Sequence, residues 1–191
     1  MMSSVNVIMP VDTGDNVADN LKPKETVIKY LAEHYTMTIA TVRGSAPWAA
    51  SVFYASDGLT LYFLSDSDSR HSKDIEKNSL VAVTVNEDYQ DWRQIKGIQM
   101  EGKAEMVITE DEIASATTAY AEKYPFTAVY LKLMSTPFPK VVKYLERFLS
   151  KLPSVPAFTT AVSHRFYKVM PVKVRFIDNE KSFGHNEEFT L

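Results

Sequence analysis

The sequence predicts an α+β fold that is mainly β, in which six or seven antiparallel strands form a small closed barrel with helices packed against it. Short segments rich in β-branched and aromatic residues follow one another in close order, with turn signals between them. The regular alternation of strands and helices that builds a parallel sheet does not occur in the sequence. One long strand segment contains two glycines at which it can bend.

Composition limits the possible classes of protein. The chain has 191 residues, which at about 150 residues per domain corresponds to one domain with extensions. Its 45% hydrophobic and 24% charged residues are typical of a soluble globular protein and exclude a wholly disordered or collagen-like chain. A net charge of -3 gives no general attraction to nucleic acid or to an anionic membrane, so a phosphate group would have to be held locally. The lack of cysteine excludes disulfides, thiolate nucleophiles, iron–sulfur clusters and cysteine zinc sites.

The N-terminal segment sets the expected domain limits. Residues 1–22 show no sustained periodicity, so we expect a flexible arm followed by one domain over 23–191. The cationic start and apolar stretch of a signal peptide are missing, and no apolar run approaches the ~20 residues of a membrane span. A cytoplasmic location is therefore expected.

The domain is predicted to begin with a short amphipathic helix. Val27, Ile28, Leu31 and Tyr35 recur at helical spacing, and Pro23 stands where the first turn of a helix tolerates it. An antiparallel meander of three strands separated by glycine-containing turns follows, at 36–42, 48–54 and 59–64.

A polar loop over 65–69 then leads into a helix over 70–78, with Ser69 or Asp68 as its N-cap. The next segment, 80–85, is apolar throughout and predicts a strand buried on both faces.

A long strand is expected over 94–108, with its bend at Gly97 or Gly102. The helix expected over 109–123 begins with a capping box, in which the side chains of its first residue and Glu112 satisfy each other's backbone amides.

A helical insertion is expected at about 125–158, where five prolines punctuate the chain. Its clearest helix, 140–152, has one apolar and one basic face; the apolar face packs on the core, or it forms a lid over a pocket or a dimer contact. Two last strands are expected at 161–169 and 172–177, with Pro171 between them.

Several motifs fail to define a catalytic or metal site. Segment 97–103 has the spacing of a phosphate-binding loop, but Ala104 replaces the hydroxyl that binds magnesium, and the segment is predicted to be strand. The pair Asp66 and Asp68 does not start a calcium loop because Arg70 stands at the third ligand position. The four histidines lack helical i, i+4 spacing, and no serine has a recognisable acid and base, so no metal site or serine hydrolase is predicted.

Segment 65–73 has the chemistry to bind a phosphate. It places hydroxyl groups and the potential cations Arg70, His71 and Lys73 at the start of a predicted helix. The free amides of a helix N-terminus and a bidentate arginine would bind a phosphate monoester. Two aspartates in the segment would repel an anion unless they point away, so a solvated loop with a helix cap is an equally good interpretation.

From about residue 36 to residue 106, and more faintly to residue 177, the sequence resembles the pyridoxamine 5'-phosphate oxidase-like FMN-binding split-barrel family. Three stretches carry the resemblance, namely the flavin-lining strand, the strand with its phosphate loop and helix, and the bent strand, at 47–54, 61–78 and 97–105. The resemblance implies a six- to seven-stranded antiparallel split β-barrel with flanking helices.

The resemblance further implies a homodimer with two FMN molecules at the subunit interface. Small side chains at 49–51 would let the isoalloxazine ring approach the backbone, and Arg70 would bind the phosphate. His71 stands where the family often has lysine, and Lys73 is a possible substitute cation. Gln99 would reach the flavin edge or be a buried strand residue bonded to backbone. The expected cofactor-binding residues are Trp48, Ala49, Ala50, Ser51, Leu64, Ser65, Ser69, Arg70, His71, Lys73 and Gln99.

Two features qualify the resemblance. Trp48 and Trp92 would stack on a flavin or substrate, or they belong to the core or an interface, as most aromatic residues do. The C-terminal stretch 183–188 lacks the arginine and histidine motif with which true pyridoxamine phosphate oxidases bind their substrate. The chain is therefore more similar to an uncharacterised bacterial subgroup, and vitamin oxidation is not expected.

Three hypotheses follow. The first is an FMN-dependent oxidoreductase that acts on an unknown small molecule; no catalytic residue is assigned, because the flavin itself carries the hydride chemistry. The second is a split barrel that binds flavin or haem as a sensor or store without turnover. The third is a structural dimer whose pocket no longer binds a ligand.

Overall fold

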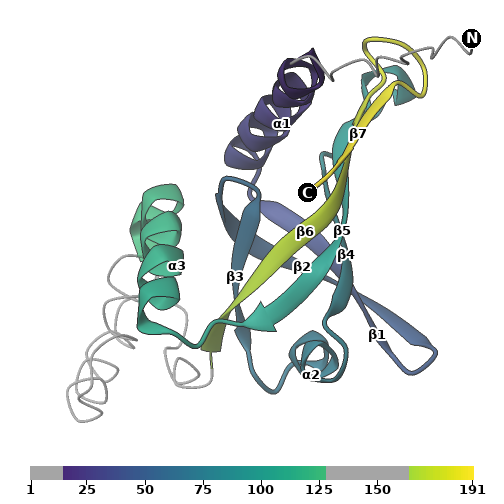
Figure 1. The fold of residues 1–191 in the computed structure, drawn as a ribbon. Helices are drawn as coiled ribbons and strands as arrows, with labels where there is room; N and C mark the ends of the chain where they lie inside the picture. Colours follow the sequence, from purple (N-terminus) through teal and green to yellow (C-terminus); the bar gives the residue numbers. More distant parts are fainter. Residues whose placement is uncertain (1–14, 128–163) are drawn as a thin grey trace, which may run out of the picture.

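The computed structural model describes residues 15–127 and 164–191 (Figure 1). The strands in these stretches are β1 Thr36–Arg43, β2 Ala46–Asp57, β3 Thr60–Asp66, β4 Leu80–Asn86, β5 Lys96–Met106, β6 His164–Asp178 and β7 Asn186–Thr190. The helices are α1 Asp15–Glu33, α2 Arg70–Lys77 and α3 Glu110–Lys123, with short 3-10 helices η1 Trp92–Gln94 and η2 Pro125–Thr127.

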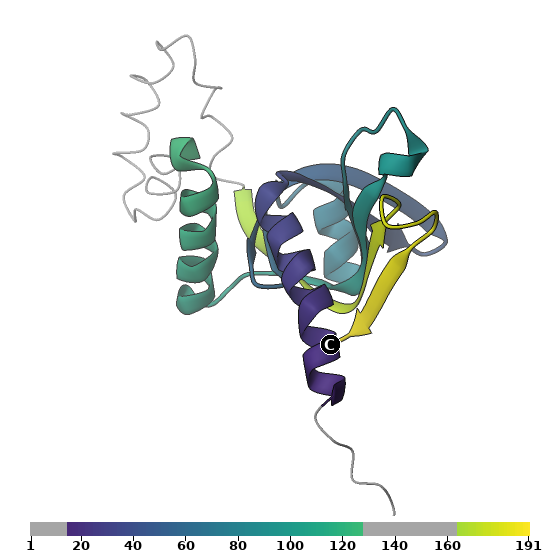
Figure 2. The same ribbon diagram turned by 90° about the horizontal axis from the view of Figure 1, so that it is seen from above.

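One antiparallel sheet contains all seven of these strands, in the order β3-β2-β1-β4-β5-β6-β7. A further antiparallel pairing of β3 with β6 closes β1 to β6 into a barrel, and β7 extends the sheet beyond β6. The α+β, mainly β fold predicted from the sequence is confirmed. In Figures 1 and 2, α1 lies at one end of the barrel, α2 at the opposite end, and α3 along its side.

The first two hairpins are set by glycine. The connections β1–β2 and β2–β3 each have two-residue loops, whose first residues, Gly44 and Gly58, have φ of 59° and 56°. Glycine adopts this left-handed conformation without a steric penalty, and its twist suits tight hairpins. The predicted turns are therefore in place.

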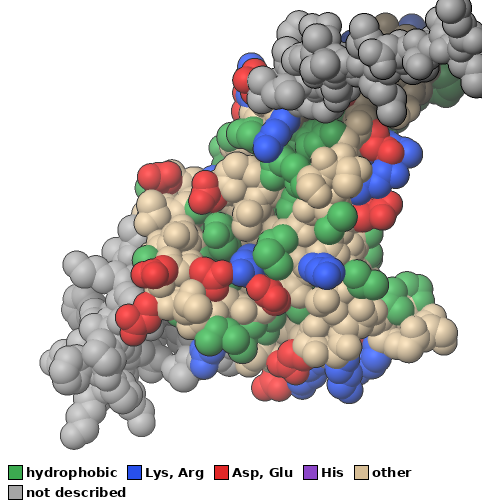
Figure 3. Space-filling view, in the orientation of Figure 1, with side chains coloured by type: hydrophobic (Ala, Val, Ile, Leu, Met, Phe, Trp, Pro, Cys, Tyr) green, Lys and Arg blue, Asp and Glu red, His purple; other side chains and the backbone are tan. Residues whose placement is uncertain are grey.

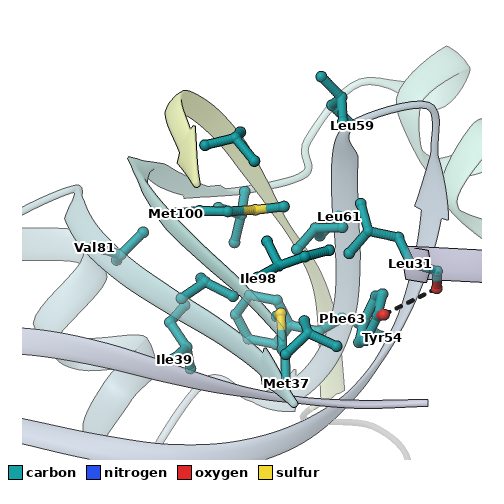
Figure 4. Close-up of a cluster of buried hydrophobic side chains, with 14 of the residues drawn as sticks. Leu31, Met37, Ile39, Tyr54, Leu59, Leu61, Phe63, Val81, Ile98 and Met100 are labelled. Carbon is teal, nitrogen blue, oxygen red and sulfur yellow. Dashed lines mark hydrogen bonds between the residues drawn. The ribbon is translucent and has the colours of Figure 1, made fainter. Parts of the chain in front are cut away.

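Side chains from all six barrel strands and from α1 fill the barrel interior (Figure 4). Met37, Ile39, Leu61 and Phe63 are at most 1% exposed and lie among one another. The Tyr54 hydroxyl donates a hydrogen bond to the Leu31 carbonyl oxygen at 2.9 Å, which joins the barrel to the end of α1.

A second apolar cluster lies outside the barrel, where α3 covers β2, β3 and β6. Its buried members are Ala55, Tyr62, Val107, Ala116, Tyr120, Tyr124 and Phe166. The Tyr120 hydroxyl donates to the Phe53 carbonyl oxygen at 2.6 Å and accepts from the Leu64 amide at 3.2 Å. We call this region the covered face.

Charged side chains of both signs lie over β3 and β6 in the view of Figure 3. Lys168 on β6 forms ion pairs with Glu105 at 2.9 Å and with Glu112 at the start of α3. Alternating charges of this kind are typical of a solvated surface.

β4 is not buried on both faces, in contrast to the prediction. Val81, Val83 and Val85 point into the barrel, whereas Leu80 on the other face is 62% exposed. Apolar residues occur on both faces of this strand, so the sequence pattern resembled that of a strand in the middle of a layered core. The outward residues of β4 instead belong to a face that no helix of the described residues covers.

The bend of the long strand lies at Gly102. A register shift occurs between Glu101 and Gly102, and a Cβ atom at Gly102 would stand 2.5 Å from the Met170 carbonyl oxygen. Gly102 pairs with Pro171, so β6 runs as one strand through this proline instead of the two strands expected. Proline is tolerated at such an irregularity because no ladder hydrogen bond is needed from its nitrogen.

Two predicted helix caps are confirmed, and the predicted start of one helix is wrong. The Ser69 side chain caps α2 by accepting from the Ser72 amide, and Thr109 caps α3 by accepting from the Glu112 amide. α1 begins at Asp15, eight residues before Pro23, so the backbone of 15–22 is helical. The fixed φ of proline also fits a helix interior, where the helix loses one backbone hydrogen bond. A proline therefore does not identify the first turn of a helix by itself.

Some predictions concern residues that the structure does not describe, or a strand that was not expected. Positions 1–14 of the expected arm, the helix over 140–152 and nearly all of the expected insertion lie outside the described residues. β7 was not predicted, because its polar sequence Asn-Glu-Glu-Phe-Thr has little strand character. In the described part of the chain, no helix has the length and apolar character needed to cross a membrane.

Candidate functional site

A group of hydroxyls surrounds the N-terminus of α2, at the end of the barrel. Ser65, at the end of β3, lies 3.1 Å from the Ser69 hydroxyl and 3.3 Å from the Ser72 hydroxyl. Ser69 donates to Ser72 at 2.8 Å. The first turn of α2 also leaves the amides of Arg70 and His71 without intrahelical acceptors. The cluster therefore offers O–H and N–H donors at one point.

His71 is part of this hydroxyl cluster. Its Nε2 lies 2.6 Å from the Ser65 hydroxyl, and its ring lies beside Phe63 with centroids 6.2 Å apart. Burial lowers the pKa of His71, and the Asp74 carboxylate opposes part of that effect. The imidazole is therefore mainly neutral near neutral pH, unless an anion binds beside it.

A buried carboxylate organises two arginines next to the cluster. Asp74 on α2 is buried; it accepts hydrogen bonds from Arg43 Nε at 2.5 Å and from the Thr41 hydroxyl at 3.1 Å. Burial would raise the pKa of Asp74, but the hydrogen bonds from Arg43 and Thr41 hold it below its ordinary value. Arg70 Nε lies 3.8 Å from the same carboxylate, and its guanidinium lies 4.4 Å from the Trp48 ring centroid. Asp74 and Trp48 thus orient Arg70.

The two aspartates of the loop are occupied by groups of the loop itself. Asp66 accepts a hydrogen bond from the Asp68 amide at 2.8 Å, and Asp68 pairs with Lys73 at 2.9 Å. Lys73, expected to bind a phosphate, is therefore neutralised by Asp68. The repulsion that these carboxylates would exert on an anion is reduced in the same way.

One buried polar atom stands behind the cluster. Tyr167 on β6 stacks on Phe63 at 5.3 Å, and its hydroxyl, beside Ser72, has no hydrogen bond of good geometry within the described residues. Buried hydroxyls without partners are rare in native proteins. The hydroxyl cluster thus has unused hydrogen-bonding capacity.

A second group of predicted residues lies outside the barrel, where strand registers align two rows of side chains, most of them small. Ser51, Thr38, Thr84 and Gln99 form the first row, across β2, β1, β4 and β5. Ala49, Ala40, Ala82 and Glu101 form the second row across the same strands. All eight side chains are exposed or half-exposed, and we call this region the open face. A flat ring could lie on it close to the backbone.

The predicted site residues thus fall into separate places. Ser65, Ser69, Arg70 and His71 meet at α2, and Trp48 joins them through Arg70. The residues on the open face are Ala49, Ser51 and Gln99, and the last is exposed rather than buried.

Three residues considered for the site lie elsewhere. Ala50 faces the barrel interior and packs on its core, because alternate residues of a strand face opposite sides. Leu64 packs in the cluster under α3. Trp92 lies away from α2 in an edge-to-face contact with Phe183 at 4.9 Å.

Sequence reasoning missed Arg43 and Thr41 entirely. They lie 31 and 33 positions from Asp74 and carry no local motif. Arg43 ends a strand beside a glycine turn, and this alone gives no sign that it faces α2. Asp74 was part of the resemblance but had no role assigned.

A closed antiparallel barrel with a polar helix terminus at one end defines the chain as a split-barrel protein. Residues 23–147 match the family model described as pyridoxamine 5'-phosphate oxidase, and the chain belongs to this family. A UPF0306 protein of Cronobacter sakazakii is 33% identical over 115 residues, which cover 59% of this chain and 76% of that protein. The expected family and its uncharacterised bacterial subgroup are confirmed.

Solved structures share the fold at low sequence identity. A heme binding protein from Mycobacterium smegmatis matches with a TM-score of 0.60 and 14% identity, over 96% of this chain and 60% of that chain. A FAD-binding protein from Mesorhizobium loti matches with a TM-score of 0.53 and 17% identity, over 78% of this chain and 88% of that chain.

Proposed function

We propose that this chain is an FMN-binding flavoprotein, an oxidoreductase for a small molecule, that works as a homodimer with FMN at the subunit interface. The observation that carries the proposal is the position of α2. Its donor-rich N-terminus, with Ser65, Ser69 and Arg70, lies against Trp48 on β2, the strand on which the next residue, Ala49, belongs to the open face.

The α2 end fits a phosphate monoester. Helix amides without acceptors and the positive end of the helix dipole favour an anion. Arg70 is 41% exposed in its side chain, so it can donate to a phosphate while Asp74 orients it. Since Arg43 already binds Asp74, the buried carboxylate stays compensated when Arg70 turns to a ligand.

The open face fits a flat ring. Ala49, Ala40 and Ala82 leave the backbone accessible, and the neighbouring row supplies hydroxyl and amide groups for the polar edge of a flavin. When bound, FMN supplies the hydride chemistry, and the chain binds and orients it.

The homodimer is supported by apolar side chains around the open face. Leu80 and Val42, on the same strand faces as Ala82 and Ala40, are 62% and 37% exposed in the single chain. A second copy that covers them would also enclose a ring held on the open face and exclude water from it.

The test is an absorbance spectrum of the untagged protein, as purified and again after addition of FMN and desalting. Wild-type protein is expected to retain about one flavin per chain. Arg70→Ala should weaken FMN binding by at least about tenfold, since hydrogen bonds to charged groups contribute about 1.5–3 kcal/mol. Arg93→Ala is the matched control, because Arg93 is exposed and paired with Asp91 on a loop away from α2. A protein that retains no flavin contradicts the proposal.

The same spectra examine the second candidate, a binding protein without turnover. The relation to a structure described as a heme binding protein favours this candidate. A Soret band, or bound flavin that neither NADH nor NADPH reduces, would support it over the oxidoreductase.

A further inference from the structure

A hollow lies at the opposite end of the open face from α2, where α1 ends beside β1 and the end of β4. Its volume is about 660 Å³, which is within the range of small-molecule sites and far more than a metal ion needs. Its lining comes from the end of α1, the start of β1, and the end of β4 with the residues that follow it.

The hollow joins the open face directly. Thr38 and Thr84 line it, and both also belong to the row that ends at Ser51 and Gln99. A molecule in the hollow would therefore lie beside a ring that rests on this row.

The lining is acidic. It includes three carboxylates, those of Glu33, Glu87 and Asp88, and no lysine or arginine. His34 is the basic side chain of the lining. A site with this charge favours cations over anions of the same size.

His34 engages one of the three carboxylates. Its Nδ1 lies 2.7 Å from the Tyr30 carbonyl oxygen, and its Nε2 lies 2.7 Å from Glu87 Oε1. The imidazole and the Glu87 carboxylate thus contact each other rather than a ligand.

The other two carboxylates differ in their partners. Asp88 makes no ion pair within the described residues, whereas Glu33, 60% exposed in its side chain, lies 4.0 Å from Lys29. Lys123, which donates to the Leu31 carbonyl oxygen, lies 5.6 Å from the Tyr35 ring centroid, and Lys96 pairs with Glu180. The three carboxylates of the lining outnumber the two ammonium groups beside it, those of Lys29 and Lys123.

An aromatic surface accompanies these carboxylates. Tyr35 lines the hollow and is 55% exposed. An aromatic face next to carboxylates suits an organic ammonium group, which gains from both. We propose that this hollow is the substrate subsite beside the flavin, and that it takes a small molecule with a cationic amine. This inference rests on the proposed function, because the flavin makes the hollow a substrate site.

The test uses three probes of one size and shape, namely benzylamine, benzyl alcohol and benzoate, which carry charges of +1, 0 and -1 near neutral pH. Binding is measured by calorimetry on the full chain, both without added flavin and after loading with FMN. Benzylamine is expected to bind at least about tenfold more tightly than the other two and to weaken in high salt.

The Glu33→Gln/Asp88→Asn variant should weaken benzylamine binding by about tenfold or more. Its control is Glu110→Gln/Glu122→Gln, which removes the same charge from exposed positions on α3 and should bind as wild type does. Equal binding of the three probes, no binding of benzylamine, or an unchanged Glu33→Gln/Asp88→Asn variant would overturn the proposal.

The two proposals fail in different ways. Retained flavin without amine binding contradicts the acidic subsite alone. Amine binding by a protein that never retains flavin contradicts the proposed function and, with it, the subsite's role beside a flavin.

Discussion

The covered face and the open face are two parts of the outer surface of one barrel, and they differ in side-chain size. Under α3 the outward residues are large, as in Tyr62 and Phe166, and both are 7% exposed. On the open face the corresponding positions hold Ala40, Ala82 and Ala49. Large apolar residues gain stability when a helix buries them, whereas small ones leave room for a ligand. Residue size thus distinguishes the wall that builds the fold from the wall that we propose binds the cofactor.

Strand β2 takes part in both faces. Its outward residue Ala55 is fully buried under α3, whereas Phe53 is 60% exposed and Ser51 lies on the open face. The boundary between the two faces therefore falls within one strand, at Phe53. Its carbonyl oxygen accepts the Tyr120 hydroxyl that fixes α3.

The greatest contrast is expected from truncating a side chain on the covered face. Tyr120→Ala removes a buried ring and two hydrogen bonds, and should lower the free energy of unfolding by about 3–5 kcal/mol. Tyr120→Phe, which keeps the ring, should cost about 1 kcal/mol. Gln99→Ala on the open face should change the free energy of unfolding by no more than about 0.5 kcal/mol. Urea unfolding measures all three; similar losses for Tyr120→Ala and Gln99→Ala would remove the distinction between the faces.

Enlarging a small side chain should have the opposite pattern, a loss of binding with little loss of stability. Ala82→Phe places a ring on the open face and should weaken FMN binding by roughly tenfold, because the flavin no longer approaches the backbone. Ser115→Phe, on an exposed position of α3, is its control and should bind normally. Fluorescence titration with FMN compares them; an Ala82→Phe protein with normal affinity would exclude the open face as the ring site.

The smallest effect is expected from His71, at the barrel end where the phosphate would lie beside the open face. Burial holds the pKa of His71 below its ordinary value of 6.5, and a bound phosphate would raise it again. Binding should then take up a proton. The ratio of wild-type to His71→Gln FMN affinity should therefore rise about threefold as the pH falls from about 8 to about 6.

The stability of the flavin-free protein should change with the opposite sign. Because the pKa of His71 is lower in the folded than in the unfolded chain, protonation favours unfolding, and wild type should lose stability relative to His71→Gln as the pH falls below about 6.5. Titrations and urea unfolding at several pH values measure both trends. An affinity ratio that does not change with pH would mean that His71 does not face the phosphate.

Local signals predicted most of the secondary structure. Thr109 was predicted as the cap of α3, and Ser69 or Asp68 as that of α2, because short polar side chains there can bond to free helix amides. The hairpin turns were predicted because glycine is favoured there. The donors at α2 were also predictable, since Ser69, Arg70 and His71 are consecutive. The predictions for the start of α1 and for a break within β6 were wrong. Both depended on a proline, whose effect varies with its surroundings.

The rest depended on residues that are distant in the sequence. Ala49 and Ala50 have the same type and neighbours, and only the barrel decides that one faces the open face and the other the core.

The sequence alone carried the class of fold, strands β1 to β5, the caps and the phosphate-binding chemistry of the α2 loop, since each arises from contacts within a few residues. Three features needed the folded chain. They are the closure of the barrel by β3 and β6, the orientation of Arg70 by Asp74, and the acidic hollow beside Thr38 and Thr84. Each joins segments that are far apart in the sequence and that come together because they bury a common core. The hydrophobic effect is not directional, so a local sequence pattern does not reveal which segments will meet.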